Sequence, residues 1–499
     1  MVPYKYVIIG GGIAGGKAVE GIRQVDQEGS VILISQEDHR PYERPPLSKG
    51  YLRAEADLSR VYLRDRGYYD ENDIETVAGF TVTQIKPGEK EVYLEDGTVL
   101  GYEKLLLATG GRAIRLEMPG SDLDNVFTLR TIKDSDAIRA AAGEGKTALV
   151  MGGSFIGTEV AASLSQIGTE IIQIFPESRL LERIVPPRVS EYLNDLFERH
   201  GVRVLPGTVA DSLSGEGKVE SAALNNGETP QVDLVVMGVG IRLNTKLARA
   251  AGLALREDDQ AVLVDQSLRT SDGNIFAAGD IAAWPDETFD QRLRVEHWDV
   301  ARRQGRHAGR AMAGEVEAYT AMPYFFSDIF DLSFEVWGNL SSWDRTVIRG
   351  SLQEDSFAVY YFDGEQLTGV LAVDRPDKER KPMQALVKAR PGYEEIAADL
   401  EDTGTDLAEL AGTESKSEAQ ASDEETLSFA EDIAPMFREK DVEEMKEISG
   451  FDLSDYDDVS SRASHIYERL KDESMPCDGP WPEEQIEKYK RWIDQGKQP

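Results

Sequence analysis

The chain has 499 residues, enough for about three domains that each bury a hydrophobic core. Its 91 Asp and Glu residues exceed its 55 Lys and Arg residues, and the formal charge of -36 argues against nucleic acid and anionic membranes as partners, because both need a basic face. The single cysteine, Cys477, excludes an internal disulfide and a redox-active dithiol within one chain, and without a leader pattern or an apolar run of membrane length we expect a cytoplasmic protein.

Residues 4–37 have the pattern of a strand, a glycine turn, a helix and a second strand. Gly10, Gly12 and Gly15 lie in the turn with GxGxxG spacing, and Glu37 closes the second strand. Glycines let the backbone approach a pyrophosphate, the start of the helix offers free amides, and an acid at the second strand can accept hydrogen bonds from a ribose. The segment therefore predicts a dinucleotide-binding unit.

Residues 148–177 repeat this plan about one domain length later. Ser154 replaces the middle glycine, which crowds the pyrophosphate slightly. Glu177 closes the following strand and favours NADH over NADPH, because a carboxylate repels a 2′-phosphate, although Arg179 and Arg183 lie close enough to soften that preference. Two such units in one chain predict two different cofactors.

Further along the chain, residues 105–110 and 275–280 each place an apolar strand before a turn of small residues. Residues 324–391 then alternate strands around the turn Asp363–Gly364 and end in a predicted helix near 383–389. This stretch predicts a third domain of the α+β class.

The C-terminal part begins with an acidic stretch, residues 394–425, which predicts a solvated linker. Helical spacing over residues 434–447 and 482–494 predicts a small helical module after it. The module resembles the latter half of small c-type cytochrome domains but has no CxxCH, which excludes covalent haem. A tethered docking module is the favoured interpretation, and a non-covalent haem on His465 or Met475 is the alternative.

Several motifs make residues 4–390 resemble the FAD-dependent pyridine-nucleotide oxidoreductases. The branch is the one that contains ferredoxin and rubredoxin reductases, monodehydroascorbate reductases and apoptosis-inducing factor. The most specific motif is Pro41-Tyr-Glu-Arg-Pro-Pro-Leu-Ser-Lys49, supported by Gly279–Asp280, Arg294–Trp298 and Pro323–Asp328.

The resemblance implies an α/β fold with two Rossmann-like domains and an α+β C-terminal domain. The expected boundaries are a discontinuous FAD-binding domain at 1–114 and 246–320, an NAD(H)-binding domain at 115–245, a reductase C-terminal domain at 321–392, an acidic linker at 393–427 and the helical module at 428–499.

The resemblance also implies site residues. Those that match positions holding FAD are Gly10, Gly12, Ala14, Gly15, Glu37, Arg44, Lys49, the backbone at Val82, Thr109, Gly110, Arg130, Asp280 and the backbone at Trp298. Those that match positions meeting the nicotinamide nucleotide are Gly153, Phe155, Ile156, Glu159, Glu177, Arg183, Gly240 and Glu296. Lys49, Glu159, Glu296 and Phe326 match positions expected to act in catalysis, the first two as a pair beside the flavin N5.

The implied activity takes hydride from NADH onto FAD and passes electrons singly to an iron–sulfur carrier such as a ferredoxin or a Rieske-type protein. One alternative is a redox-switched interaction protein like apoptosis-inducing factor, and another is a monodehydroascorbate or quinone reductase. Monodehydroascorbate reductases carry a tyrosine at the position of Phe326, which argues against the ascorbate radical as acceptor.

The remaining expectations concern partners and metals. The five histidines show no metal-ligand spacing, so we expect no metal. We expect a monomer or a homodimer. Ferredoxin reductases usually offer a basic patch to an acidic ferredoxin, and a chain with this net charge departs from that pattern except where local patches exist.

Overall fold

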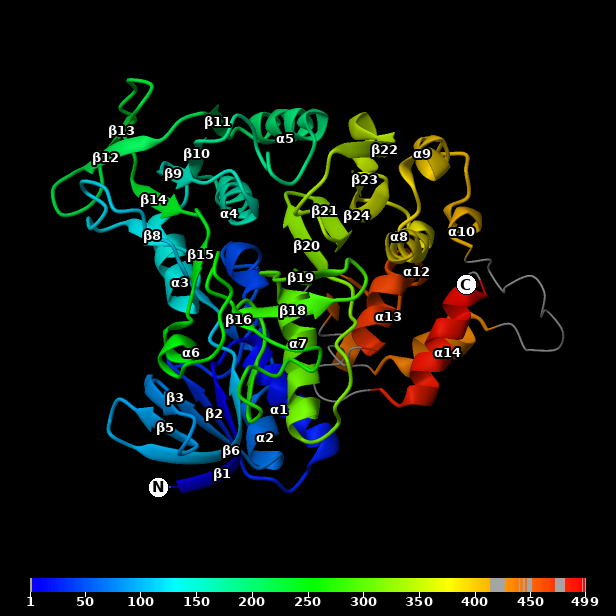
Figure 1. The fold of residues 1–499 in the computed structure, drawn as a ribbon. Coiled ribbons are helices and arrows are strands. Elements are labelled where there is room, and N and C mark those ends of the chain that lie inside the picture. Colours follow the sequence, from blue (N-terminus) through cyan, green and yellow to red (C-terminus); the bar gives the residue numbers. More distant parts are fainter. Residues whose placement is uncertain are drawn as a thin grey trace. The chain divides into compact units, whose positions relative to one another are not determined.

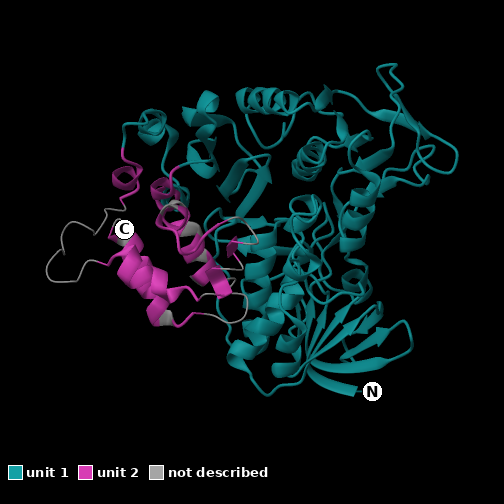
Figure 2. Cartoon of the chain, turned by 180° about the vertical axis from the view of Figure 1, so that it is seen from behind, with its two compact units in different colours: residues 1–375, 383–405 teal, residues 376–382, 406–499 magenta. Residues whose placement is uncertain are grey.

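The computed structural model describes residues 2–412, 427–438, 440–442, 445–446, 451–471, 481–495 and 497–498. The chain divides into two compact units, which Figure 2 colours separately: unit 1 comprises residues 1–375 and 383–405, and unit 2 comprises residues 376–382 and 406–499. Within the described residues, no helix is both long enough and apolar enough to cross a membrane.

The first sheet of unit 1 has the strand order β3-β2-β1-β6-β5-β4, with β17 paired to β6. Figure 1 labels β1, β2, β3, β5 and β6 of this sheet. Its strands are β1 (Val2–Ile9), β2 (Val31–Ser35), β3 (Ile74–Ala78), β4 (Val82–Lys86), β5 (Glu91–Leu94), β6 (Val99–Leu107) and β17 (Ile275–Ala277). Ile9 is level with Ile34 and Leu107, so the parallel strands β1, β2 and β6 end at one edge of the sheet. Helices α1 (Ile13–Val25) and α7 (Trp298–Met312) pack against each other beside this sheet.

The second sheet is parallel, with the order β11-β10-β9-β14-β8. Its strands are β8 (Val126–Thr128), β9 (Thr147–Met151), β10 (Glu170–Phe175), β11 (Arg203–Pro206) and β14 (Leu234–Met237). The helices of this region are α3 (Ile132–Ala141), α4 (Phe155–Gln166) and α5 (Pro187–Arg199), and β12 (Ala210–Ser214) with β13 (Ser221–Leu224) forms a separate hairpin.

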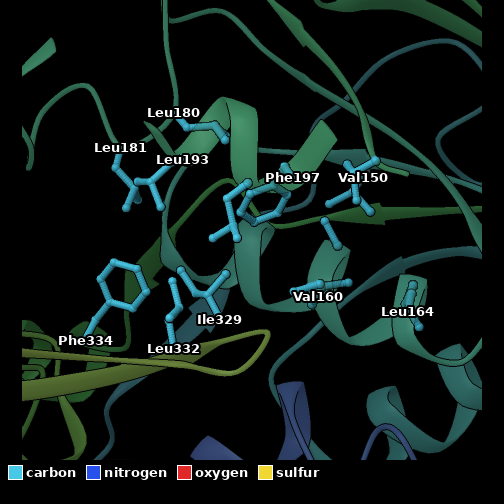
Figure 3. Packing of buried hydrophobic residues seen from close by; sticks show 14 of the residues in the cluster. Val150, Val160, Leu164, Leu180, Leu181, Leu193, Phe197, Ile329, Leu332 and Phe334 are labelled. Carbon is cyan, nitrogen blue, oxygen red and sulfur yellow. The ribbon is translucent and has the colours of Figure 1, made fainter. Parts of the chain in front are cut away.

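The third sheet is antiparallel, with the order β20-β21-β24-β23-β22. Its elements are β20 (Tyr324–Ile329), β21 (Leu332–Gly338), β22 (Arg345–Ser351), β23 (Ser356–Asp363), β24 (Gln366–Val373), α8 (Asp377–Ala389) and α9 (Tyr393–Glu401). Figure 3 shows Ile329, Leu332 and Phe334 of this region beside Val160 and Phe197 of the second. One buried cluster therefore continues from the second sheet into the third.

Shorter elements connect these sheets. They are η1 (Pro45–Ser48), η2 (Leu58–Arg60), α2 (Arg66–Glu71), β7 (Gly111–Ala113), β15 (Ile241–Leu243), α6 (Lys246–Ala250), β16 (Val262–Leu263), β18 (Ala282–Asp286), β19 (Gln291–Leu293) and η3 (Leu352–Glu354).

The acidic linker predicted for residues 393–427 is wrong over its first part, because α9 and α10 (Leu407–Leu410) are helical there. Ile396 and Leu400 stand four residues apart and are buried, so the acids of α9 occupy its exposed positions. The buried guanidinium of Arg349 donates to the carbonyl of Asp402 at 2.6 Å and to that of Thr405 at 2.9 Å, which fixes the chain after α9. Composition alone hid this apolar spacing. Residues 413–426 of the predicted linker lie outside the described residues.

Unit 2 has an aromatic core of its own, which includes Phe429, Phe437, Trp481, Tyr489 and Trp492. Its described elements are α10, η4 (Phe429–Ile433), η5 (Ala434–Met436), α12 (Tyr456–Ser461), α13 (Ala463–Lys471) and α14 (Glu483–Asp494). The predicted helix over 434–447 begins as the short η5 and then falls partly outside the described residues. Met475, Cys477 and the side chain of His465 also lie outside them, so the proposed haem ligands have no described geometry.

Candidate active site

A cavity of about 1170 Å³ lies at the edge where the strands of the first sheet end. It is larger than the roughly 300–1000 Å³ of pockets that hold one drug-sized ligand, so it has room for an extended dinucleotide. The predicted site residues that line it are Gly10, Gly12, Ala14, Glu37, Arg44, Lys49, Val82, Thr109, Gly110, Arg130, Phe155, Ile156, Glu159, Asp280, Glu296, Trp298 and Phe326.

The first glycine turn explains how this cavity could accept a phosphate. Gly10 follows β1 with φ of +128°, and a Cβ there would come within 2.1 Å of the carbonyl oxygen of Ala108. Gly12 is the N-cap residue of α1, and a Cβ there would meet no heavy atom of the described residues within 4 Å. The first amides of α1 therefore open onto free space, which is the arrangement that binds a pyrophosphate.

Two polar clusters fix the edges of the cavity. Beyond β2, Glu37 accepts hydrogen bonds from Tyr42 Oη at 2.6 Å and from Arg44 Nη2 at 3.1 Å, which orients its carboxylate. After β17, Asp280 accepts a hydrogen bond from Arg130 Nη2 at 2.7 Å. A carboxylate at the end of β2 suits a ribose diol.

Lys49 and Glu159 form a buried ion pair in the wall of the cavity. The distance from Lys49 Nζ to Glu159 Oε1 is 2.7 Å, and their side chains are 13% and 6% exposed. Lys49 follows η1 and Glu159 lies on α4, so the pair joins the first region of the chain to the second. The hydroxyls of Ser48 and Ser327 also donate to the Glu159 carboxylate.

Aromatic rings form another part of the wall. The imidazole of His297 lies 5.7 Å from the ring of Phe326 and 5.1 Å from that of Phe325, centroid to centroid. Burial lowers the pKa of His297 to about 4, so its imidazole is neutral at pH 7. Trp298 starts α7, and its buried indole N–H has no hydrogen-bond partner among the described residues. The open backbone at Gly12 and the unpaired indole N–H of Trp298 fit a bound FAD.

The second glycine turn repeats the backbone of the first. Gly152 has φ of +134°, and a Cβ there would come within 2.3 Å of the carbonyl oxygen of Gly238. Ser154 is the N-cap residue of α4, without a side-chain capping hydrogen bond. Glu177 follows β10 and lies 3.5 Å from Nη2 of Arg183, whose side chain is 86% exposed.

Five of the predicted residues do not line the cavity, whereas Glu296 does. Gly15 faces the backbone of its own turn, since a Cβ there would lie 1.9 Å from the carbonyl oxygen of Gly10. Gly153, Glu177 and Gly240 lie just beyond the ends of second-sheet strands, and Arg183 lies in the loop between β10 and α5; none of the four lines the cavity. Glu296 lines the cavity and pairs with Arg294 Nη1 at 2.6 Å.

The sequence did not indicate a role for Ser48 or Ser327, although both fall inside motifs that carry the family resemblance. Each stands beside a residue that was singled out, Lys49 in one case and Phe326 in the other. A serine next to a predicted site residue was the only signal for them, and its partner, Glu159, is more than a hundred positions away from either.

Comparisons with known proteins agree with this geometry. Residues 4–305 match the pyridine nucleotide-disulphide oxidoreductase family, and residues 324–411 match the reductase C-terminal family. Putidaredoxin reductase CamA of Pseudomonas putida is 32% identical over 391 residues, 77% of this chain and 92% of the relative. Monodehydroascorbate reductase 3 of Arabidopsis thaliana is 32% identical over 422 residues, 79% of this chain and 94% of the relative.

A solved structure, that of the covalent putidaredoxin reductase–putidaredoxin complex, superimposes with a TM-score of 0.78 at 31% identity and covers 83% of this chain and 99% of that one. The predicted fold class is confirmed, and so is an oxidoreductase that uses FAD and NAD(P)H. The chain belongs to the pyridine nucleotide-disulphide oxidoreductase family, in the group that also carries the reductase C-terminal domain.

Proposed function

We propose that this chain is an NADH-dependent reductase that passes electrons to a ferredoxin-type iron–sulfur protein. The observation that carries the proposal is the buried Lys49–Glu159 pair, which stands in one cavity between the first glycine turn and the start of α4. The whole sequence has a single cysteine and so cannot form a dithiol relay, which leaves direct transfer to an external acceptor. The name and the solved complex of putidaredoxin reductase support an iron–sulfur acceptor.

The residues of the cavity position two cofactors rather than supply acid–base chemistry. When bound, FAD supplies the two-electron acceptor and the one-electron donor that the reaction needs. The α1 amides and Glu37 would hold its nucleotide end, and the ammonium of Lys49 in the cavity wall would stabilise negative charge on the reduced cofactor. Glu159 keeps that buried ammonium paired, because an unpaired buried cation is costly.

The preference for NADH rests on Glu177. Its carboxylate ends the strand that follows the second glycine turn, where it can accept hydrogen bonds from the ribose hydroxyls of NADH and repel the 2′-phosphate of NADPH. Arg183 is its ion-pair partner and is mostly exposed, so the preference is moderate rather than absolute.

The arginines of helix α7 lie near the cavity, but each is paired with an acid. Helix α7 starts at Trp298 beside the cavity and carries Arg302, Arg303, Arg306 and Arg310 along its length. Arg302 and Arg303 pair with Asp299, Arg306 pairs with Glu20, and Arg310 pairs with Glu315. The proposal of a ferredoxin-type partner therefore rests on the relatives and not on a basic surface.

Reduction of monodehydroascorbate is the second candidate function, because monodehydroascorbate reductase 3 matches over 94% of its length. Phe326 favours the protein carrier over this small radical, since a phenylalanine has no hydroxyl with which to bind a polar acceptor.

The test is rapid mixing of the yellow, FAD-loaded protein with NADH or NADPH, followed by mixing with a ferredoxin, with cytochrome c or with monodehydroascorbate. The proposal predicts faster reduction by NADH and faster reoxidation by the ferredoxin than by monodehydroascorbate. Slow reduction with a long-lived charge-transfer band would instead identify a redox-switched interaction protein. A protein that retains no FAD would overturn the proposal.

A further inference from the structure

Two serine hydroxyls hold the Glu159 carboxylate. Ser48 Oγ lies 2.5 Å from Glu159 Oε2, and Ser327 Oγ lies 2.6 Å from Glu159 Oε1. All three side chains are at least nine-tenths buried, so water does not compete strongly for these bonds. Lys49 Nζ donates to Oε1, the oxygen that also accepts from Ser327.

The donors come from different parts of the chain. Ser48 ends η1 and Lys49 follows it, Glu159 lies on α4 after the second glycine turn, and Ser327 lies on β20 of the third sheet. The third sheet therefore reaches the ion pair through one hydroxyl. Phe326, which lines the cavity, directly precedes that hydroxyl in β20.

The geometry points to Ser48 and Ser327 as positioning residues that set how much positive charge Lys49 presents to bound FAD. This inference rests on the proposed function, in which FAD lies beside Lys49. Hydrogen bonds from both hydroxyls stabilise part of the negative charge of Glu159. The carboxylate therefore holds Lys49 in place but offsets less of the positive charge of its ammonium. Through Ser327 the third sheet contributes to the reduction potential of the cofactor.

Removal of a hydroxyl has a predictable sign. In Ser48→Ala or Ser327→Ala the Glu159 carboxylate loses a hydrogen-bond donor. Its negative charge then offsets more of the positive charge of the Lys49 ammonium. The ammonium then stabilises reduced FAD less, so the midpoint potential of bound FAD falls. We expect a decrease of about tenfold in the equilibrium constant for two-electron reduction, which is about 30 mV, for each single variant.

The experiment is a spectroelectrochemical titration of the FAD-loaded full chain without pyridine nucleotide, so the readout does not depend on turnover. Ser163→Ala is the matched control. Ser163 is a buried serine on α4 whose hydroxyl donates to the carbonyl of Ser48 at 2.6 Å and makes no described contact with Glu159. Loss of this hydroxyl should leave the potential unchanged.

Rescue by a conservative change separates positioning from packing. Ser327→Thr keeps a hydroxyl and should keep the wild-type potential, whereas Ser327→Ala should lower it. Unchanged potentials in both alanine variants would overturn the inference, and so would an equal shift in Ser163→Ala. If the wild type binds FAD and is reduced by NADH while the alanine variants titrate like it, the proposed function stands and only this inference fails.

Discussion

In the turn at Gly10 and in the turn at Gly152 the backbone is nearly the same, with φ of +128° and +134°. Both glycines face a carbonyl oxygen of a neighbouring strand end, that of Ala108 or that of Gly238, at a distance that admits no side chain. The N-cap residues differ: Gly12 opens the first turn completely, and Ser154 partly fills the second.

The acids that complete the two turns differ as well. The carboxylate of Glu37 is held by Tyr42 and Arg44 within hydrogen-bond distance, whereas the described contact of the Glu177 carboxylate is with a largely exposed Arg183 at 3.5 Å. The two turns therefore have similar backbones, but among the described contacts the carboxylate that follows the first turn is held by hydrogen bonds and the carboxylate that follows the second is not. We expect the first to retain its ligand between turnovers and the second to exchange its ligand in each one.

The largest expected effect comes from the Lys49–Glu159 ion pair, which joins the region of the first glycine turn to that of the second. Lys49→Met leaves the buried carboxylate of Glu159 without its cation, which should cost about 3–5 kcal/mol of unfolding free energy. Chemical denaturation of the FAD-loaded protein measures this loss. The double variant Lys49→Met with Glu159→Gln removes both charges and should recover most of the stability but not the rate of reduction by NADH. If Lys49→Met were as stable as the wild type, the ion pair would not stabilise the contact between these two regions.

His297 tests whether water reaches the cavity wall beside β20. Burial lowers its pKa from the ordinary 6.5 to about 4, so the unfolded chain binds a proton at a higher pH than the folded one. Its contribution to stability is complete above pH 6.5 and is lost as the pH falls towards 4, by about 3 kcal/mol. His297→Asn should lack this loss when unfolding is followed by denaturation between pH 7 and pH 4. Equal losses in the two proteins would mean that water reaches the imidazole.

Gly12→Ser gives the first turn the residue of the second. The backbone at Gly12 has φ of -82°, which any residue adopts, and a Cβ there meets no described atom, so the fold should keep its stability. The added side chain should instead crowd bound FAD and weaken its affinity roughly 10- to 100-fold. Flavin fluorescence on dilution measures the release of FAD. Unchanged retention would mean that the N-cap residue does not distinguish the two turns.

These comparisons also show which parts of the site a sequence can reveal. Gly10, Gly12 and Glu37 were predictable because a short motif between a strand and a helix forces them to one sheet edge. The Lys49–Glu159 pair came only from the family resemblance, since its partners lie 110 positions apart. Ser48 and Ser327 were missed because a buried hydroxyl acquires its role from a distant partner. The helix α9 was missed because its acids dominate the composition while Ile396 and Leu400 carry its packing.

The smallest expected effect concerns Glu177, the acid that follows the second glycine turn. Glu177→Gln removes a negative charge but keeps an oxygen that can accept a hydrogen bond from a ribose, so NADH should bind nearly as well. NADPH should gain, because its 2′-phosphate no longer meets a carboxylate and Arg183 loses its partner. A charge interaction near the surface is worth about 1 kcal/mol, so the ratio of kcat/KM for NADH over NADPH should fall roughly fivefold.

Glu182→Gln is the matched control for this change, since Glu182 lies in the same loop, accepts hydrogen bonds from the backbone and the hydroxyl of Ser178, and pairs with Arg179 at 3.4 Å. The control therefore also removes one negative charge and leaves one arginine without its acid, but away from Glu177. It should leave the ratio unchanged. An equal fall in both variants would mean that the net charge of the loop, rather than the position of Glu177 after β10, selects the nucleotide. A fall of the NADH-to-NADPH ratio of kcat/KM in Glu177→Gln alone, with FAD still fully retained, would support the comparison. It would mean that Glu177 affects nucleotide selection at the second turn without affecting the binding of FAD at the first.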